Sequence, residues 1–293
     1  MVRVGFKTFC HQVDWPALEA TWSLGGQLDV FESAWLNDHL GDFSFERGGP
    51  AFEALTLLAA LARHVPGKWI GHLALSNTFR HPAIVARAAL TMDHVTKGQF
   101  VLGLGAGWHE GEHETNGIEL PPIGKRIDQL GDTARIMRAL FGEGGRGAPG
   151  VDLEAGSVKL RGATMEPLPV RPGGPLLFLC GQGPRGLRLA AELADGWNYS
   201  ANQAGSSPQG FRERRDILNA ACEAHGRDPS SLWLSVQIVV PPTPAARAEG
   251  LSLARAYVRA GTNEIVLGLG DPIGPAALQA LADEVAKPLR DRS

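Results

Sequence analysis

The chain has 293 residues, of which 44% are hydrophobic and 20% are charged, so it is long enough to bury a sizeable globular core. Its net charge of −3, with no run of five or more basic residues, argues against a nucleic-acid or anionic-membrane partner. Three widely spaced cysteines favour reduced thiols over a disulfide framework, and the N-terminus shows no signal-peptide pattern. We therefore expect a cytoplasmic protein that binds neither nucleic acid nor membrane.

Short apolar runs alternate with segments of helical period along the whole chain. The predicted strands are 2–9, 30–36, 69–75, 100–104, 176–180, 196–199, 232–239 and 264–267. The predicted helices are 16–24, 51–64, 82–95, 123–141, 184–194, 207–225, 245–260 and 275–285. Strands that alternate with helices form a parallel sheet, because parallel strands need crossover connections. Eight such units favour an α/β fold of the (β/α)8 TIM-barrel type over a doubly wound sheet with a second domain.

The first predicted helix carries its own start and stop signals. Asp14 is a suitable N-cap, and Pro16 stands in the first turn, where a missing N–H costs nothing. Gly25 and Gly26 follow the apolar pattern and predict the end of this helix.

The second predicted strand ends in Asp38 and His39. In a barrel, chemistry takes place at the C-terminal ends of the strands. An Asp-His pair at that rim can hold an oriented imidazole, which exchanges protons efficiently near neutral pH. The alternative is that Asp38 caps a turn and His39 is a solvated loop residue.

The third predicted strand runs into Ser76, Asn77 and Thr78, just before Pro82 opens the next helix. These small polar residues could contact a ligand at the strand end, or they could serve only as turn and cap formers. Their position at the functional end of a strand favours ligand contact.

The fourth predicted strand ends in glycines at alternate positions, Gly103, Gly105 and Gly107, followed by Trp108 and His109. Glycine lets a backbone approach a flat or charged ligand closely, because no Cβ stands in the way. The same pattern can also make a tight bend from strand to loop.

The residues from His109 to His113 match HExxH, the zinc-hydrolase motif, which requires two histidines on one face of a helix. Here the motif follows a strand end directly, and Gly111 lies inside the helix that the motif needs. We therefore keep a zinc hydrolase only as a distant alternative and expect no metal.

The segment 143–175 breaks the alternation, because it is rich in Gly and Pro and carries only short alternating pieces at 151–153 and 158–160. We interpret it as an insertion after the fourth helix, within a single domain that spans 1–293. Such an insertion can cover the active-site end of a barrel, or it can be a disordered loop.

The fifth predicted strand leads into a GxGxxG motif whose members include Gly181, Gly183 and Arg185. A dinucleotide site would need an acidic residue at the end of the next strand, but that strand ends in Trp197-Asn198-Tyr199. Exposed amides at a helix N-terminus beside an arginine still predict an anion site, of the kind that binds phosphate.

Several of these segments together resemble the bacterial luciferase-like family of flavin- and deazaflavin-dependent oxidoreductases. The similar strings are SAWLNDHL, LALSNTFRHPAIVARAALTMDHVTKGQFVLGLGAGWHEGEH, GIELPPIGKRIDQL and CGQGPRGLRLAAELADGWN. They cover roughly half of the chain in the family's order, whereas the C-terminal third is similar only in pattern. The resemblance implies a luciferase-like TIM barrel whose cofactor ring lies across the strand ends.

The resemblance also implies roles for residues named above. Asp38 and His39 would lie near the ring, with His39 exchanging a proton and Asp38 orienting it. A non-prolyl cis peptide would form a bulge behind the ring at Leu73-Ala74. The cofactor-binding residues would be Leu73, Ala74, Ser76, Asn77, Gly105, Ala106, Gly107, Gly181, Gln182, Gly183, Pro184 and Arg185.

The implied reaction is hydride transfer between a small organic substrate and the deazaflavin F420. The alternative is an FMN-dependent monooxygenase that uses reduced flavin and O2, and a barrel that only binds cofactor is a further possibility. Sugar-phosphate-oxidising members have a glutamate where this chain has Trp108, so an apolar or aromatic substrate is expected. Its pocket would include Phe43, Trp108, His109 and Asn198. The family also implies a homodimer and, as a possible partner, a flavin or F420 reductase.

Overall fold

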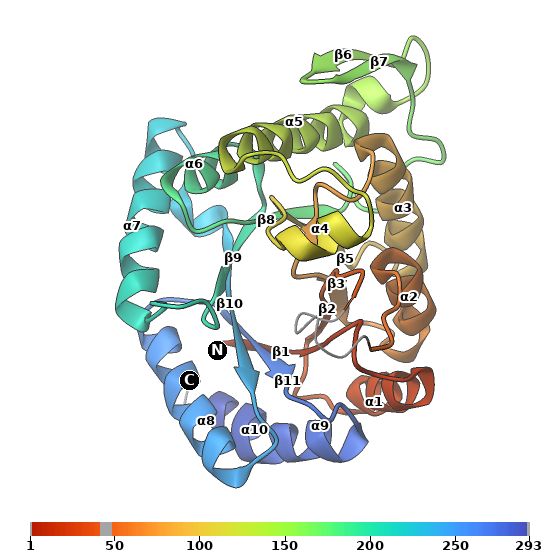
Figure 1. The fold of residues 1–293 in the computed structure, drawn as a ribbon. Helices are drawn as coiled ribbons and strands as arrows, with labels where there is room; N and C mark the ends of the chain where they lie inside the picture. Colours follow the sequence, from red (N-terminus) through yellow and green to blue (C-terminus); the bar gives the residue numbers. More distant parts are fainter. Residues whose placement is uncertain (1, 42–48, 292–293) are drawn as a thin grey trace.

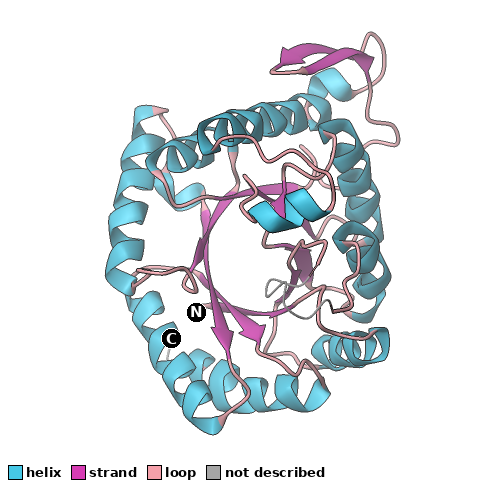
Figure 2. Cartoon of the chain, viewed as in Figure 1, coloured by secondary structure: helices cyan, strands magenta, loops and turns pink. Residues whose placement is uncertain are grey.

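A closed barrel of eight parallel strands, surrounded by helices, forms the centre of the molecule (Figures 1 and 2). This computed structural model describes residues 2–41 and 49–291. The barrel strands are β1 (Arg3–Thr8), β2 (Ser33–Leu36), β3 (Trp69–His72) with β4 (Leu75–Ser76), β5 (Phe100–Gly105), β8 (Leu176–Cys180), β9 (Gly196–Ser200), β10 (Trp233–Val240) and β11 (Glu264–Leu269). Pairing of β3 with β5 closes the barrel, so the predicted (β/α)8 fold is confirmed.

Each barrel strand is followed by a helix that covers its outer face (Figure 2). The covering helices are α1 (Trp15–Gln27), α2 (Ala54–Leu61), α3 (Pro82–Val95), α5 (Ile123–Phe141), α6 (Pro184–Leu193), α7 (Pro208–Ala224), α8 (Pro244–Arg259) and α9 (Pro275–Leu281). A π-helical turn, Ala282–Ala286, joins α9 to α10 (Lys287–Arg290). First-turn prolines and side-chain caps such as Asp14 and Thr243 fix where these helices begin.

Helix α1 is longer than predicted, because Gly25 and Gly26 lie inside it rather than beyond its end. A Cβ on Gly25 would come within 2.5 Å of the Phe6 ring, and one on Gly26 within 2.0 Å of the carbonyl oxygen of His64. Both glycines therefore allow close packing of the helix on its neighbours, and neither acts as a stop signal.

The insertion after α5 forms an antiparallel hairpin of β6 (Val151–Ala155) and β7 (Val158–Ala163). The hairpin lies outside the ring of helices, next to α5, so it does not close over the barrel (Figure 1). The chain that follows is tied to α3: Arg87 donates to the carbonyl of Glu166 at 3.1 Å, and Asp93 accepts the Val170 N–H at 2.7 Å. Both sequence alternatives, a cover over the barrel end and a disordered loop, are thus wrong.

Large side chains fill the barrel interior at its N-terminal end. Trp35, Phe178 and Trp233 form an aromatic cluster with ring centroids 5.3–6.4 Å apart. Val101 and Val266 belong to this second apolar cluster, which is separate from the core between strands and helices, and Leu73, which follows the C-terminal end of β3, is its member nearest the C-terminal ends of the strands. We call this cluster the barrel base.

Among the residues that the structure describes, none of the helices combines the length and the apolar character needed to cross a membrane.

Candidate active site

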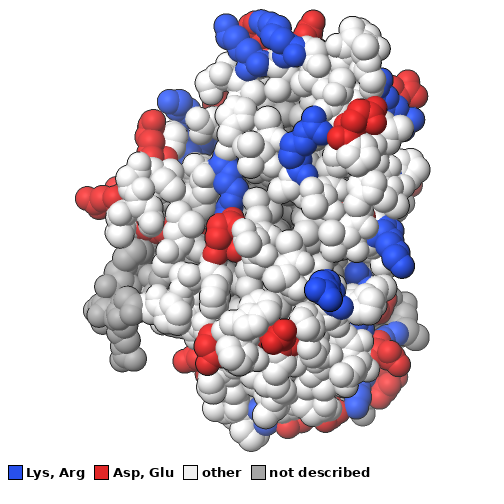
Figure 3. All heavy atoms as spheres, turned by 90° about the vertical axis from the view of Figure 1, so that its right-hand side faces the viewer, with Lys and Arg blue, Asp and Glu red and all other residues white. Residues whose placement is uncertain are grey.

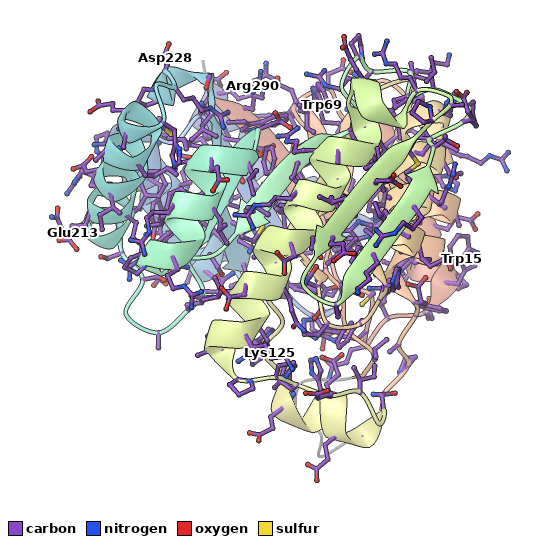
Figure 4. The ribbon with its side chains drawn as sticks, turned by 90° about the horizontal axis from the view of Figure 1, so that it is seen from above. Trp15, Trp69, Lys125, Glu213, Asp228 and Arg290 are labelled. Atoms are coloured by element: carbon purple, nitrogen blue, oxygen red, sulfur yellow. The ribbon has the colours of Figure 1, made fainter. Side chains whose placement is uncertain are left out.

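The described site residues gather at the C-terminal ends of the barrel strands, which we call the barrel mouth. Figure 4 shows the short helix α4 (Glu110–Thr115) and Lys125 at this end of the molecule, whereas Trp69, at the start of β3, lies at the opposite end. The strands therefore deliver the predicted polar segments to one face, as expected for a barrel. Phe43, predicted to line the substrate pocket, lies outside the described residues.

The third barrel strand is interrupted at the mouth. Its two parts, β3 and β4, are separated by a cis peptide bond between Leu73 and Ala74, so the predicted position of this bond is confirmed. The ammonium of Lys7 donates a hydrogen bond of 2.7 Å to the Leu73 carbonyl oxygen from across the barrel interior. The interruption is thus held from within by a side chain of β1.

Lys7 belongs to a buried polar network that the sequence analysis did not identify. Besides Leu73, its ammonium contacts the amide oxygen of Gln237, and the Gln237 amide donates to Asn198 at 3.0 Å. Burial lowers the pKa of Lys7 to about 8. The sequence does contain a signal for this network. Arg3, Gly5 and Lys7 alternate with apolar residues in the first strand, so they share one face of the strand, which is the face toward the barrel interior. The predicted pocket residue Asn198 is part of this network.

His39 is nearly buried at the mouth, and its partner is Glu112. The Nδ1 atom of His39 lies 3.0 Å from Glu112 Oε2, while the other carboxylate oxygen accepts the Leu40 N–H. Burial would raise the pKa of Glu112, but hydrogen bonding to His39, its charge and the Leu40 N–H outweigh burial and lower it. Since an ionised carboxylate only accepts hydrogen bonds, Nδ1 of His39 carries a proton, and in the neutral ring Nε2 carries the lone pair.

Asp38 does not orient His39, contrary to the expectation from sequence. Its two oxygens accept a bidentate pair of bonds from Arg80 at 2.6 and 2.9 Å, and one of them also accepts the Ser76 N–H at 2.8 Å. Arg80 in turn contacts Glu53, the N-cap of α2. Asp38 therefore connects the ends of the second and third barrel strands through hydrogen bonds, whereas His39 contacts Glu112.

The polar cluster after the third strand contacts the glycine end of β5. The Asn77 N–H donates to the Gly105 carbonyl at 2.9 Å. A Cβ on Gly107, whose φ is +77°, would lie 2.9 Å from the Ser76 hydroxyl and 2.7 Å from that of Thr78. Gly107 is therefore required by its conformation and by close contact with both hydroxyls.

Two glycines of β5, Gly103 and Gly105, have different surroundings. A Cβ on Gly103 would come within 1.9 Å of the His72 carbonyl, so packing between strands explains that glycine. At Gly105 the nearest atom would be 3.5 Å away, at ordinary contact distance. The space beside Gly105 is consistent with close approach of a ligand at the mouth.

The HExxH segment forms the short helix α4, so the expectation that Gly111 opposes a helix is wrong. His109 is its N-cap and accepts the Glu112 N–H at Nδ1, whereas His113 uses Nδ1 for the His109 carbonyl and Nε2 for Thr78. No group of three or more His, Cys, Asp or Glu side chains in the described ranges is arranged to hold a metal. A zinc hydrolase is therefore not supported.

The glycine-rich loop between β8 and α6 opens the N-terminus of α6 to the surface. Gly183 is the N-cap, Pro184 follows, and a Cβ on Gly183 would meet no atom within 4 Å. Gln182 donates to the Ser200 carbonyl at 3.1 Å and fixes the loop. The N–H groups of the first helical turn and the helix dipole favour an anion at such a terminus.

Two arginines lie at helix starts on this side of the barrel, Arg185 in the first turn of α6 and Arg126 in the first turn of α5. Arg185 contacts Asp128 of α5, so its half-exposed guanidinium already has a carboxylate partner. Arg126, which the sequence analysis did not single out, donates to the Gly107 carbonyl, and its buried Nε has no hydrogen-bond partner among the described residues. Its place at the start of α5 could not be related to Gly107 from sequence spacing alone.

Trp108 is an exposed aromatic side chain at the mouth. Its side chain is 63% exposed, and its ring lies 6.0 Å from His39 and 4.7 Å from His109 in edge-to-face geometry. Trp108 and His109, both predicted as pocket residues, therefore lie beside the His39–Glu112 pair.

Comparison with known proteins agrees with this architecture. The model of the luciferase-like monooxygenase family matches residues 30–288, so the chain belongs to this family. An F420-dependent glucose-6-phosphate dehydrogenase of Amycolatopsis mediterranei (strain U-32) is 27% identical over 67% of the chain and 57% of that protein. The pyrimidine monooxygenase RutA of Escherichia coli (strain SE11) is 30% identical over 67% of the chain and 50% of that protein.

A solved structure of an F420-dependent secondary alcohol dehydrogenase, in complex with an F420-acetone adduct, has the same fold. It covers 99% of both chains with a TM-score of 0.83 and 19% sequence identity. The chain spans only about half to three fifths of the length of the curated relatives that it matches.

Proposed function

We propose that this protein is a luciferase-like oxidoreductase that uses F420 for hydride transfer to or from a small organic substrate. The observation that carries the proposal is the buried His39–Glu112 pair at the mouth, the same end of the barrel at which the backbone of Gly105 has open space beside it. The F420-dependent relatives support the choice of cofactor. FMN with O2 is the second candidate, because the monooxygenase RutA is equally similar to the chain.

The residues present fit a phosphate-bearing ring cofactor. The α6 N-terminus, with Gly183 and Arg185, would hold the phosphate. The ring would lie against the cofactor-binding residues of the third and fourth strand ends, Leu73, Ala74, Ser76, Asn77, Gly105, Ala106 and Gly107. When bound, the cofactor supplies the hydride acceptor or donor, and the protein positions it.

His39 is the proposed proton donor or acceptor. Its Nδ1–H faces Glu112, so Nε2 is the atom that exchanges a proton with the substrate. Glu112 fixes the ring orientation and stabilises the imidazolium when it forms. The proton exchange by His39 and its orientation by Glu112 are the same whether F420 or FMN is bound.

The proposed substrate is an apolar or aromatic small molecule. Trp108 occupies the position where sugar-phosphate-oxidising family members have a glutamate, and its exposed ring offers a stacking surface. A sugar phosphate is therefore disfavoured, although one F420-dependent relative carries that substrate in its name.

We also propose a cytoplasmic homodimer, with a flavin or F420 reductase as a possible partner. On the face that carries α2 and α3, charged side chains are sparse near the centre (Figure 3). Ile84 and Val95, both on α3, are 62% and 48% exposed, and their spacing places them on the same side of the helix. We propose this side of α3 as the dimer interface.

Light scattering tests this interface. The wild-type protein should have twice the mass of one chain, and Ile84→Glu should have the mass of the monomer. A monomeric wild-type protein would contradict the interface.

Equilibrium binding of F420 and of FMN, followed by absorbance, tests the cofactor. We expect F420 to bind at least about tenfold more tightly, a difference of about 1.4 kcal/mol. Turnover is then measured with F420 and propan-2-ol, and with reduced FMN, O2 and uracil, probes chosen from the names of the relatives. Tighter binding of FMN would favour the monooxygenase, and failure to bind either cofactor would overturn the proposal.

A further inference from the structure

Three side chains at the mouth form a continuous hydrogen-bonded line, and the function proposed above uses only Ser76, as a cofactor-binding residue, and none of the hydrogen bonds between them. The Ser76 hydroxyl lies 2.8 Å from that of Thr78, and the Thr78 hydroxyl lies 2.6 Å from Nε2 of His113. At the far end, Nδ1 of His113 lies 2.7 Å from the His109 carbonyl oxygen. We call Ser76, Thr78 and His113 the hydroxyl relay.

The direction of the hydrogen bonds in this relay follows from its fixed end. A carbonyl oxygen cannot donate, so Nδ1 of His113 carries the proton and, in the neutral ring, Nε2 accepts from Thr78. Thr78 then accepts from Ser76, and the Ser76 oxygen presents a lone pair to the mouth. If His113 gains a second proton, each bond reverses, and the Ser76 hydroxyl becomes a donor.

The packing around the relay keeps it in this geometry. His113 is 1% exposed and packs against the Phe79 ring at 4.9 Å, while Gly107 approaches both hydroxyls closely. The titratable and charged groups around His113 are His109, Glu110, Glu112 and Glu114 on its own helix, and the Asp38–Arg80 pair behind Ser76. The relay uses the side chain of His113, whereas the His39–Glu112 pair uses that of Glu112, its neighbour on α4.

Thr78 also borders a cavity of about 260 Å³ between α3, α5 and the hairpin. Exposed residues, among them His81, Glu119 and Ser157, form part of its wall. The middle of the relay is therefore next to a space that solvent can reach, which gives a proton a second route out of the mouth.

From this geometry we infer that the hydroxyl relay exchanges a proton between the barrel mouth and His113 during the reaction. A group in the mouth gives a proton to Ser76 Oγ, Ser76 gives its own to Thr78 Oγ1, and Thr78 gives its own to Nε2 of His113. One proton enters and one imidazolium forms, without transfer of electrons; the reverse sequence returns the proton. His113 is thus a positioning and proton-holding residue that acts through Ser76. The inference rests on the proposed function, because it needs a proton-coupled reaction at the mouth.

Side-chain ¹⁵N NMR of the unliganded protein tests the relay without any cofactor. We expect the neutral ring of His113 to be the Nδ1–H tautomer, with the Nε2 resonance shifted by the bond from Thr78. Thr78→Val removes the donor at almost constant shape and should move this resonance, whereas Thr78→Ser should restore it. An Nε2–H tautomer in the wild type, or an identical resonance in Thr78→Val, would overturn the relay.

Kinetics at saturating cofactor test its role in the reaction. Thr78→Val should lower kcat about tenfold with KM changed less than twofold, and it should turn a curved proton inventory in H2O–D2O mixtures into a linear one. Thr78→Ser should recover both properties, and Thr115→Val, at an exposed threonine of α4, serves as the matched control. An unchanged kcat and inventory in Thr78→Val would refute the inference even though the enzyme is active. If no cofactor binds, the proposed function fails, and the NMR experiment alone decides whether the hydrogen-bonded relay exists.

Discussion

The two ends of the barrel interior bury ionisable groups in opposite ways. At the base, Glu264 accepts a bond from the Ser33 hydroxyl, but its second oxygen has no hydrogen-bond partner among the described residues, and burial raises its pKa to about 7. At the mouth, the side chain of Glu112 is also shielded from solvent, though less deeply than that of Glu264, and His39 and the Leu40 N–H lower its pKa. The pKa of each carboxyl group therefore reflects the depth of its burial together with the partners available to it.

This contrast separates a structural end from a chemical one. The base combines tightly packed aromatic rings with a carboxyl group that stays protonated below neutral pH. At the mouth, the pKa of Glu112 is lowered beside an imidazole, and Asp38 pairs with a guanidinium. Changes at the mouth should affect turnover and ligand binding, and changes at the base should affect stability.

The largest effect is expected for His39→Ala. Loss of the proposed acid–base group should lower kcat by at least about a hundredfold, within the usual range of such catalysis, while cofactor affinity changes only a few-fold. The measurement uses saturating cofactor, and His225→Ala, at the exposed end of α7, is the matched control. Unchanged turnover would make His39 a loop residue and direct attention to Trp108, His109 and Asn198.

A smaller effect on turnover is expected for Glu112→Gln. The amide cannot accept from both His39 and the Leu40 N–H, so the imidazole loses its orientation and its negative neighbour. We expect kcat to fall about thirtyfold, as for other groups that hold a functional histidine, with KM nearly constant. Glu114→Gln changes an exposed carboxylate of the same helix and should be silent. Equal behaviour of the two variants would show that the pair is only structural.

Gly183→Val tests the phosphate loop. An added Cβ meets no protein atom within 4 Å, so the substitution should weaken what binds at the loop and lower the affinity for the intact cofactor about tenfold. A ring fragment without phosphate should bind as before. Gly274, the N-cap of α9, also precedes a proline and also has open space around it, so Gly274→Val is a close control. Equal losses for cofactor and fragment would exclude a phosphate site at this loop.

The smallest effect on activity, less than about twofold, is expected at the base for Glu264→Gln. Folded Glu264 keeps its proton up to about pH 7, but the unfolded chain releases it near pH 4.5. The free energy of unfolding should therefore fall as pH rises from 4.5 to 7, by on the order of 3 kcal/mol from this group, and then level off. Urea unfolding at several pH values should show this slope in the wild type and in the exposed control Glu249→Gln, but not in Glu264→Gln. If the slope persists in Glu264→Gln, the carboxyl group of Glu264 is not responsible for the pH dependence.

The sequence was sufficient for the fold because strand and helix periods are local properties. The eight barrel strands were located within a few residues, and the interruption at Leu73-Ala74 was placed by family resemblance. Helix α4 was missed because six residues carry too little periodicity, and the glycines of α1 were misjudged because their contacts come from elsewhere in the chain.

The partners within the site could not be predicted in the same way. His39 and Glu112 are 73 positions apart, and Lys7 and Gln237 are 230 apart, so no spacing rule connects them. Asp38 next to His39 suggested a pair, but side chains of consecutive residues in an extended segment point to opposite sides. The sequence thus predicted that Asp38 and His39 lie at the mouth, where the structure has them, but it paired His39 with Asp38 instead of Glu112.

The exposure of Trp108 has a practical consequence for spectroscopy. The other six tryptophans are buried or partly buried, whereas Trp108 is 63% exposed and lies beside His39. When the tryptophans are excited, we therefore expect a red-shifted component of the fluorescence emission that comes from Trp108 at the barrel mouth. A ligand that enters the mouth should quench or shift that component and leave the emission of the buried indoles in place, so the protein carries its own fluorescent reporter of occupancy.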